Sequence, residues 1–387
     1  MNKTNRGRLP HVLLLYRSMI PSIRLCGHGQ MQQLAVNGWI DYCFKTVWKV
    51  RRAELEWADI VLLGRLDGWY EQQLVKALKA CGKYLIYILD DDLLHIPDGL
   101  SVSSYYRRKD VQYWIQSMLK MSDALLSTSP LLLEEYGKGK EKLLTEGFAV
   151  QPVFCSDRRE GEPIRIGFAG SLDRCRDVET ILHHALCRVK GRYADQVSIE
   201  FFGIAPAFAA EVDAKIIPYV DNYENYRERL NEMRWDIGLA PMADTPFHSR
   251  KYYNKFIEYS AAGVVGVYSA VQPYLRLNLN EEMGIFCENT PEAWTQAICC
   301  LVEDAPLRET MRRKANEYVR ENMTVEHAAS VLRDRMESIL DYRPEACHMR
   351  TCLSLMKLVA MCRRAMDALV KYKWGIFKKL LKKQSDG

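Results

Sequence analysis

One stretch of the sequence, residues 235–269, strongly limits the folds that the chain can adopt. Residues 236–240 form a short apolar run that is typical of a buried strand. A polar loop and a helical pattern separate this run from a second apolar run at residues 264–268. Two buried strands that are joined through a helix need a parallel sheet with a crossover connection. The stretch therefore predicts an α/β fold.

The loop inside this stretch carries cations next to the predicted helix. Ligands of open parallel sheets bind beyond the carboxyl ends of the strands, which is where this loop lies. Arg250 and Lys251 precede the helix, and two cations there oppose its dipole unless they share an anion. We therefore expect Arg250 and Lys251 to hold a phosphate or diphosphate. Glu258, an acid within the apolar helix pattern, is suited to accept hydrogen bonds from the vicinal diol of a ribose.

The same stretch resembles the donor-site segment of GT-B glycosyltransferases of the cell-surface polysaccharide and cell-wall kind. Those proteins carry a Glu, a second Glu after seven residues, and then a small-small-Gly-aliphatic run. Glu258 and residues 261–263 match the second half, whereas Arg250 stands in place of the first Glu. A sub-group of the family has a closer layout, which is matched by Trp235, Asp236, Pro241, Phe247, Lys251, Lys255, Glu258, Tyr259 and Gly263.

This resemblance implies two Rossmann-like domains that face each other across a cleft. Residues 147–163 show no periodicity, and a strand-helix pattern restarts at Ile164. The predicted organisation is an acceptor domain at 1–150, a linker at 151–163, a nucleotide-sugar domain at 164–345 and a tail at 346–387.

Three consecutive acids, Asp90, Asp91 and Asp92, directly follow an apolar run in the first predicted domain. Carboxylates so close together repel each other, so they need a partner or a raised pKa. They are suited to bind a divalent metal, to contact sugar hydroxyls, or to cap the next turn. The resemblance favours contact with the sugar, because enzymes of this kind need no metal. It implies a substrate-site role for Asp90 and Asp91, with no metal ligands and no cofactor.

The resemblance also implies further donor-binding residues in the second domain. Gly170 matches the turn after the domain's first strand, where the family has cations for the diphosphate. Arg174 lies close to that turn, and it is equally consistent with a solvated loop charge. The loops after the next two strands surround the nucleotide base in this family, which makes Gly203 and Tyr219 candidates.

The last part of the chain has a different composition. Residues 349–383 place apolar side chains at helical spacing among many Lys and Arg residues, with Trp374 and Phe377 near the end. This basic amphipathic pattern is typical of a helix that lies in a membrane interface, and an anionic membrane surface is the expected partner. A helix packed on this protein, or on a partner, remains the alternative. The basic residues follow no known nucleic-acid-binding module, so no nucleic-acid partner is expected.

The apolar runs and the cysteines of the sequence indicate in which cellular compartment the protein is expected. No apolar run approaches the ~18 residues that span a bilayer, so we expect a cytoplasmic body that is peripherally attached to the inner face of the membrane. Twelve cysteines lie at irregular spacings, without a CxxC or a Cys/His cluster of zinc spacing. Reduced thiols of a cytoplasmic protein are the expectation.

Together these features predict a glycosyltransferase that moves a sugar from a nucleotide-diphosphate sugar to a glycan or lipid-linked acceptor. The resemblance implies a metal-independent reaction with retention of configuration. A non-catalytic scaffold protein of the same fold is the alternative, because Arg250 replaces an acid of the family pattern. A dinucleotide enzyme is disfavoured, since no Gly-x-Gly-x-x-Gly follows the first strand of either domain.

Overall fold

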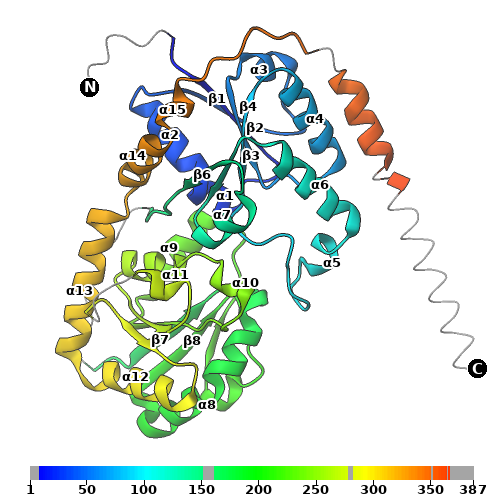
Figure 1. Cartoon of the computed structure of the whole chain (residues 1–387). Helices are drawn as coiled ribbons and strands as arrows, with labels where there is room; N and C mark the ends of the chain where they lie inside the picture. The colour runs from blue at the N-terminus through cyan, green and yellow to red at the C-terminus, as the bar shows by residue number, and fades with distance from the viewer. Residues whose placement is uncertain (1–7, 151–160, 278–281, 350–351, 364, 367–387) are drawn as a thin grey trace, which may run out of the picture.

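The computed structural model describes residues 8–150, 161–277, 282–349, 352–363 and 365–366. The chain forms two parallel sheets of six strands each, one in each half of the molecule (Figure 1). The predicted α/β architecture with two Rossmann-like domains is confirmed.

The first sheet has the strand order β2-β1-β3-β4-β5-β6. Its central strands are apolar throughout because helices cover both faces. The strands are β1 (His11–Tyr16), β2 (Asp41–Thr46), β3 (Ile60–Gly64), β4 (Tyr84–Ile88), β5 (Ala124–Ser127) and β6 (Glu141–Leu144). The helices of this part are α1 (Pro21–Ile23), η2 (Arg24–His28), α2 (Gly29–Val36), α3 (Arg52–Trp57), α4 (Trp69–Ala80), α5 (Ser103–Tyr106), α6 (Lys109–Met121) and α7 (Pro130–Tyr136).

The second sheet has the order β12-β11-β10-β7-β8-β9. Helices α8 and α12 share a core with one face, and α9, α11 and α13 share a core with the other. The strands are β7 (Ile164–Ala169), β8 (Val197–Phe202), β9 (Lys215–Ile217), β10 (Ile237–Ala240), β11 (Val265–Ser269) and β12 (Ile285–Cys287). The main helices are α8 (Cys175–Tyr193), α9 (Tyr223–Met233), α10 (Pro246–Ser249), α11 (Asn254–Ala261), α12 (Pro291–Glu303) and α13 (Ala305–Asn322).

The chain returns to the first sheet after α13. Helices α14 (Val325–Arg335) and α15 (Glu337–Leu340) lie beside α2 in Figure 1. Leu332 and Met336 are fully buried in one core with Val12 and Leu14 of β1. The sequence-based boundary, which put residues 164–345 in one domain, is therefore wrong for these two helices. Helical periodicity reveals an apolar face, but it does not reveal which sheet that face covers.

The beginning of the tail packs on the first domain. Cys347 forms a disulfide with Cys81 at the end of α4, with 5.4 Å between their Cα atoms, so the expectation of reduced thiols does not hold for this pair. Residues 353–363 are helical, and Ala360 is buried against the first domain. The predicted amphipathic helix extends to residue 383, and its part beyond residue 366 lies outside the described residues.

The basic side chains of this helical segment do not all face solvent. Lys357 Nζ donates to the Val50 carbonyl at 3.2 Å, and the Arg363 guanidinium lies 4.8 Å from the centre of the Trp69 ring. Outward-facing apolar side chains remain, including Leu355 and Leu358, which are more than half exposed. Across the described part of the chain, no helix has the length and apolar character needed to cross a membrane.

Candidate active site

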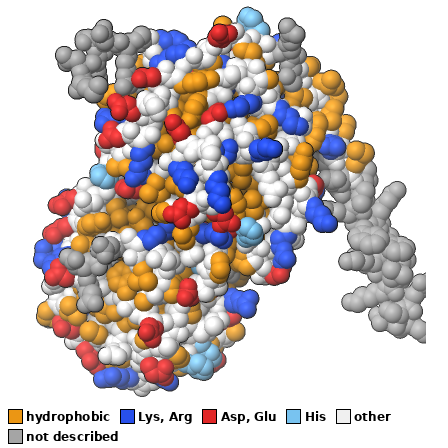
Figure 2. Space-filling model, viewed as in Figure 1, with side chains coloured by type: hydrophobic (Ala, Val, Ile, Leu, Met, Phe, Trp, Pro, Cys, Tyr) orange, Lys and Arg blue, Asp and Glu red, His pale blue; other side chains and the backbone are white. Residues whose placement is uncertain are grey.

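The loops that follow β4 and β10 meet between the two domains. Lys251 Nζ lies 3.0 Å from Asp91 Oδ1, and Arg250 Nη1 lies 2.7 Å from Asp92 Oδ2. Figure 2 shows charged side chains of both signs along the crease between the domains. Because each loop follows the carboxyl end of an inner strand, the ligand-binding ends of the two sheets face each other.

Each acid of the Asp90–Asp92 run has its own partner. Arg65, which follows β3, donates to Asp90 Oδ2 at 3.1 Å. Burial raises the pKa of Asp91, but Lys251 and Arg65 outweigh burial and hold this pKa below its usual value. Asp92 is fully buried and accepts from the Tyr136 hydroxyl at 2.7 Å as well as from Arg250. Cations and donors from both domains thus relieve the repulsion that the sequence implies.

Lys251 belongs to a cluster that includes Arg174 and His248. His248 Nε2 lies 3.5 Å from Asp177 Oδ2, and Arg174 Nη2 lies 3.2 Å from the same oxygen. Burial lowers the pKa of His248 to about 4, and Arg174 and Lys251 add to this effect against the opposing Asp177. The imidazole is therefore neutral at pH 7. The Lys251 ammonium lies 4.6 Å from the centre of the Phe247 ring, which helps to fix its position.

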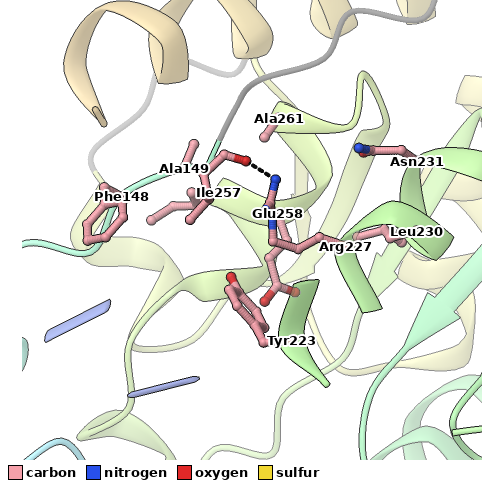
Figure 3. Close-up of a pocket in the computed structure, with 10 residues that line it drawn as sticks. Phe148, Ala149, Tyr223, Arg227, Leu230, Asn231, Ile257, Glu258 and Ala261 are labelled. Atoms are coloured by element: carbon pink, nitrogen blue, oxygen red, sulfur yellow. Dashed lines mark hydrogen bonds between the residues drawn. The ribbon is translucent and has the colours of Figure 1, made fainter. Parts of the chain in front are cut away.

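Glu258 lies on α11 next to α9. Its Oε2 accepts from Lys255 Nζ at 2.6 Å and from the Tyr226 hydroxyl at 2.9 Å. Figure 3 shows the Glu258 carboxylate beside Tyr223 in a small pocket that also includes Arg227. A carboxylate held by two donors in this way is preorganised to accept hydrogen bonds from a bound polar ligand.

Three residues predicted from separate parts of the sequence gather at the carboxyl ends of β7, β8 and β9. The Gly170 amide donates to the Phe202 carbonyl at 3.0 Å, and the Gly203 amide donates to the Ile217 carbonyl at 2.9 Å. Gly203 has a φ of +86°, and a Cβ on it would lie 2.3 Å from the Gly170 oxygen. Tyr219 lies beside Gly203 and is 57% exposed. Only glycine fits at position 203, and an exposed aromatic ring flanks the turn.

Comparisons with known proteins identify the fold. No protein-family model and no curated protein matches the sequence. Sucrose-phosphate synthase from Thermosynechococcus elongatus superimposes with a TM-score of 0.61 at 14% identity, over 86% of this chain and 99% of that chain. Anabaena HepE in complex with UDP and glucose gives 0.54 at 12% identity, over 86% and 99% of the two chains. The chain has the GT-B fold.

A third similar structure limits what the fold implies. A Listeria monocytogenes protein named as a UDP-N-acetylglucosamine 2-epimerase gives a TM-score of 0.54 at 11% identity, over 88% of this chain and 99% of that chain. At such identities the likeness establishes the fold alone, because one fold can carry different chemistries. The activity of this chain has to be argued from its site.

Sequence reasoning missed several residues of this site. Arg65 follows strand β3 as Asp90 follows β4, so its position at a strand end was a usable signal. Lys255 was part of the resemblance but received no role. His248, Asp177 and Tyr226 gave no local signal, since they become site residues only through contacts with other elements.

Arg250 differs from Lys251 in its surroundings. Its guanidinium contacts Asp92 and Glu135, and both belong to the first domain. Arg250 therefore joins the domains in this structure, and its predicted contact with a phosphate stays a prediction.

Proposed function

We propose that this protein is a glycosyltransferase that moves a sugar from a nucleotide-diphosphate sugar to a glycan or lipid-linked acceptor. The observation that carries the proposal is the convergence of Arg174, His248 and Lys251 with Asp91 where the carboxyl ends of the two sheets face each other. Two permanent cations from the second domain and a carboxylate from the first suit a diphosphate and a sugar, respectively.

The cations have a defined role in the reaction. When the bond between sugar and diphosphate breaks, negative charge grows on the diphosphate, and preorganised cations stabilise it. Lys251 and Arg174 supply that charge, and neutral His248 supplies a hydrogen-bonding ring nitrogen. Lys251 exchanges its partner Asp91 for a phosphate oxygen when the donor binds, which frees Asp91 to contact the sugar. This arrangement needs no metal ion, and by resemblance the configuration of the sugar is retained.

The remaining donor contacts are assigned from where the residues lie relative to the strand ends of the second domain. Glu258 accepts hydrogen bonds from the ribose, and Gly170 allows close approach of the diphosphate to the backbone. Gly203 and Tyr219 flank the base. Asp90, which Arg65 holds in place, lies next to Asp91 and faces the transferred sugar together with it.

The acceptor occupies a hollow of about 720 Å³ at the carboxyl ends of β1 and β3. Arg17, Trp48, Asp67 and Tyr105 line it, and Arg17 donates to the Tyr105 hydroxyl at 2.8 Å. Aromatic faces and paired charges of both signs suit sugar rings, which offer C–H faces and hydroxyl groups. A second hollow shares Arg17 and Tyr105 and extends to the tail helix, which leaves room for a longer glycan or a lipid carrier.

The tail attaches the enzyme to the cytoplasmic face of a membrane. Leu355, Leu358 and Met361 face outward, and basic residues continue through residue 383. Apolar side chains flanked by cations fit an anionic membrane surface, where lipid-linked acceptors lie.

The test is nucleotide binding by the full chain in the presence of EDTA. Thermal shifts with UDP, GDP, dTDP and CDP identify the base, because a ligand of the folded state raises the melting temperature. Glu258→Ala should weaken binding of the chosen nucleotide about 100-fold, since two hydrogen bonds to a charged group are lost at roughly 1.5 kcal/mol each. Release of the free nucleoside diphosphate from the matching nucleotide sugar then measures the transfer.

The matched control is Glu232→Ala. Glu232 is an exposed acid at the end of the neighbouring helix α9, where it pairs with Arg229 at 2.8 Å. This variant should bind the nucleotide as the wild type does. A folded protein that binds none of the four nucleotides would favour the scaffold alternative. Unchanged binding by Glu258→Ala would remove Glu258 from the donor site.

A further inference from the structure

Three side chains that commonly ligate metals gather on the surface of the second domain, away from the crease. His183 and Cys187 lie on α8, and Glu211 lies in η5 (Ala209–Val212) after β8. Their donor atoms all lie within 4.8 Å of one another. We propose that His183, Cys187 and Glu211 bind a zinc-type transition-metal ion, with water as the fourth ligand.

The distances between the ligand atoms fit this assignment. His183 Nε2 lies 2.9 Å from Glu211 Oε2, and Cys187 Sγ lies 3.9 Å from the same oxygen. With Zn–N and Zn–O bonds of about 2.1 Å and Zn–S of about 2.3 Å, a tetrahedral ion separates N from O by about 3.4 Å and S from O by about 3.6 Å. Both of these distances are within about half an ångström of that geometry, and the His183 nitrogen and the Cys187 sulfur lie within 4.8 Å of each other, so side-chain rotation can complete the site.

Rigid elements hold the ligands. His183 and Cys187 are four residues apart on a 19-residue helix, so they lie on the same face. The segment that carries Glu211 is fastened to this helix by Glu179 Oε1, which accepts from the Ala207 amide at 2.8 Å. The His183 ring also stacks on Phe208 at 4.7 Å. Because these contacts fix both α8 and the Glu211 segment, the backbone on both sides of the site is already ordered before an ion binds.

The ligand types select the ion. Thiolate and imidazole favour Zn²⁺ and similar transition metals, whereas Mg²⁺ and Ca²⁺ prefer oxygen ligands. His183 and Cys187 are partly exposed and Glu211 is exposed, which provides an entry path. The sequence shows no Cys/His cluster of zinc spacing because the third ligand, Glu211, comes from a segment after the next strand.

The position of the site gives the ion a structural role. Helix α8 begins directly after Arg174, and the Glu211 segment follows Gly203. An ion that joins α8 to the Glu211 segment would make both elements more rigid. Both elements adjoin residues of the proposed donor site, and the ion itself would not contact the donor. A stabilising effect of zinc would then arise here and not at Asp90–Asp92.

The experiment uses the full chain after treatment with EDTA and dialysis. Titration with Co²⁺ should produce a thiolate-to-cobalt charge-transfer band that saturates at one equivalent, and Zn²⁺ should displace the cobalt. Zn²⁺ should raise the melting temperature, because it binds the folded site, while Mg²⁺ should leave it unchanged.

Two variants and one control assign the site. Cys187→Ser should abolish the charge-transfer band and weaken zinc binding at least 100-fold, and Glu211→Gln should weaken zinc binding at least 10-fold while the band remains at high cobalt. Cys300→Ser, which removes an exposed thiol on α12, should behave as the wild type. Absence of the band in the wild type, or its survival in Cys187→Ser, would overturn the proposal. Nucleotide binding by all three variants in EDTA, where no ion occupies the site, should match that of the wild type, so failure of the proposed function would appear separately.

Discussion

The ion pair between Arg250 and Asp92 provides a sharp test of how the two domains are held together. The Asp92 side chain is fully buried, whereas Arg250 is one-fifth exposed and lies 2.7 Å away. Arg250→Ala leaves a buried carboxylate without its cation. Removing one partner of a buried pair costs about 3–5 kcal/mol.

We expect a loss near the lower limit, about 3 kcal/mol, for a structural reason. The Tyr136 hydroxyl still donates to Asp92 at 2.7 Å, and His95 Nδ1 lies 3.2 Å from the carboxylate, so part of the buried charge stays solvated by protein groups. Such a loss is a large share of the roughly 5–15 kcal/mol that stabilises a typical domain.

The assay is equilibrium unfolding in urea, followed by tryptophan fluorescence and by circular dichroism. The two probes together show whether the domains unfold in one transition, on which a single free energy depends. The double variant Asp92→Asn with Arg250→Ala removes the buried charge along with its cation, so it should recover at least half of the loss. Arg229→Ala breaks an exposed pair with Glu232 and should cost less than about 1 kcal/mol.

Two results would refute this reasoning. One is a cost of Arg250→Ala that is no larger than that of Arg229→Ala. The other is a double variant that is no more stable than Arg250→Ala alone. If Arg250→Ala instead weakens nucleotide binding without loss of stability, Arg250 binds the donor phosphate, as the sequence pattern predicts.

Three further predictions concern separate parts of the molecule. Gly203→Ala should lower the free energy of unfolding by at least about 2 kcal/mol, because φ is +86° and a Cβ would lie 2.3 Å from the Gly170 oxygen. Urea unfolding measures this loss, and an unchanged unfolding midpoint would contradict the prediction. The pKa of His248 is about 4 in the folded state and about 6.5 in the unfolded state. Its neutral imidazole therefore makes its full contribution to the free energy of unfolding above pH 6.5. This contribution is lost as the pH falls toward 4, by at most about 3 kcal/mol. The free energy of unfolding, measured from pH 7 to 5, should therefore fall less steeply in His248→Gln than in the wild type. Part of the pH dependence should remain in this variant, because burial also lowers the pKa of His28 to about 4. Replacing Leu355 and Leu358 together by Asp should reduce co-sedimentation with anionic phospholipid vesicles at least 10-fold, and equal binding by this variant and the wild type would assign the tail another partner.

The strand-helix organisation could be predicted because its signals are local. The apolar runs at 236–240 and 264–268 correspond to β10 (Ile237–Ala240) and β11 (Val265–Ser269), since buried parallel strands are apolar on both faces. Strand β6 (Glu141–Leu144) was not predicted. Its first two side chains are exposed, and only its pairing with β5 defines it.

The candidate site could be predicted in part. Asp91 and Lys251 were chosen separately, each because it follows a strand end, and strand ends of parallel sheets are where ligands bind. Their 3.0 Å contact across the two domains could not be derived, because nothing in either local sequence specifies how the domains face each other. The same holds for Arg250, whose fully buried partner lies 158 residues away in the chain.

The sequence by itself therefore determined the class of fold, the strand ends that carry polar residues, and the basic character of the tail, because each depends on the order and spacing of nearby residues. The tertiary structure alone decided that α14 and α15 cover the first sheet, that Arg250 joins the domains, and that Glu211 meets His183 and Cys187. These features depend on which surfaces pack together, and packing between distant segments is set by the complementarity of the whole chain.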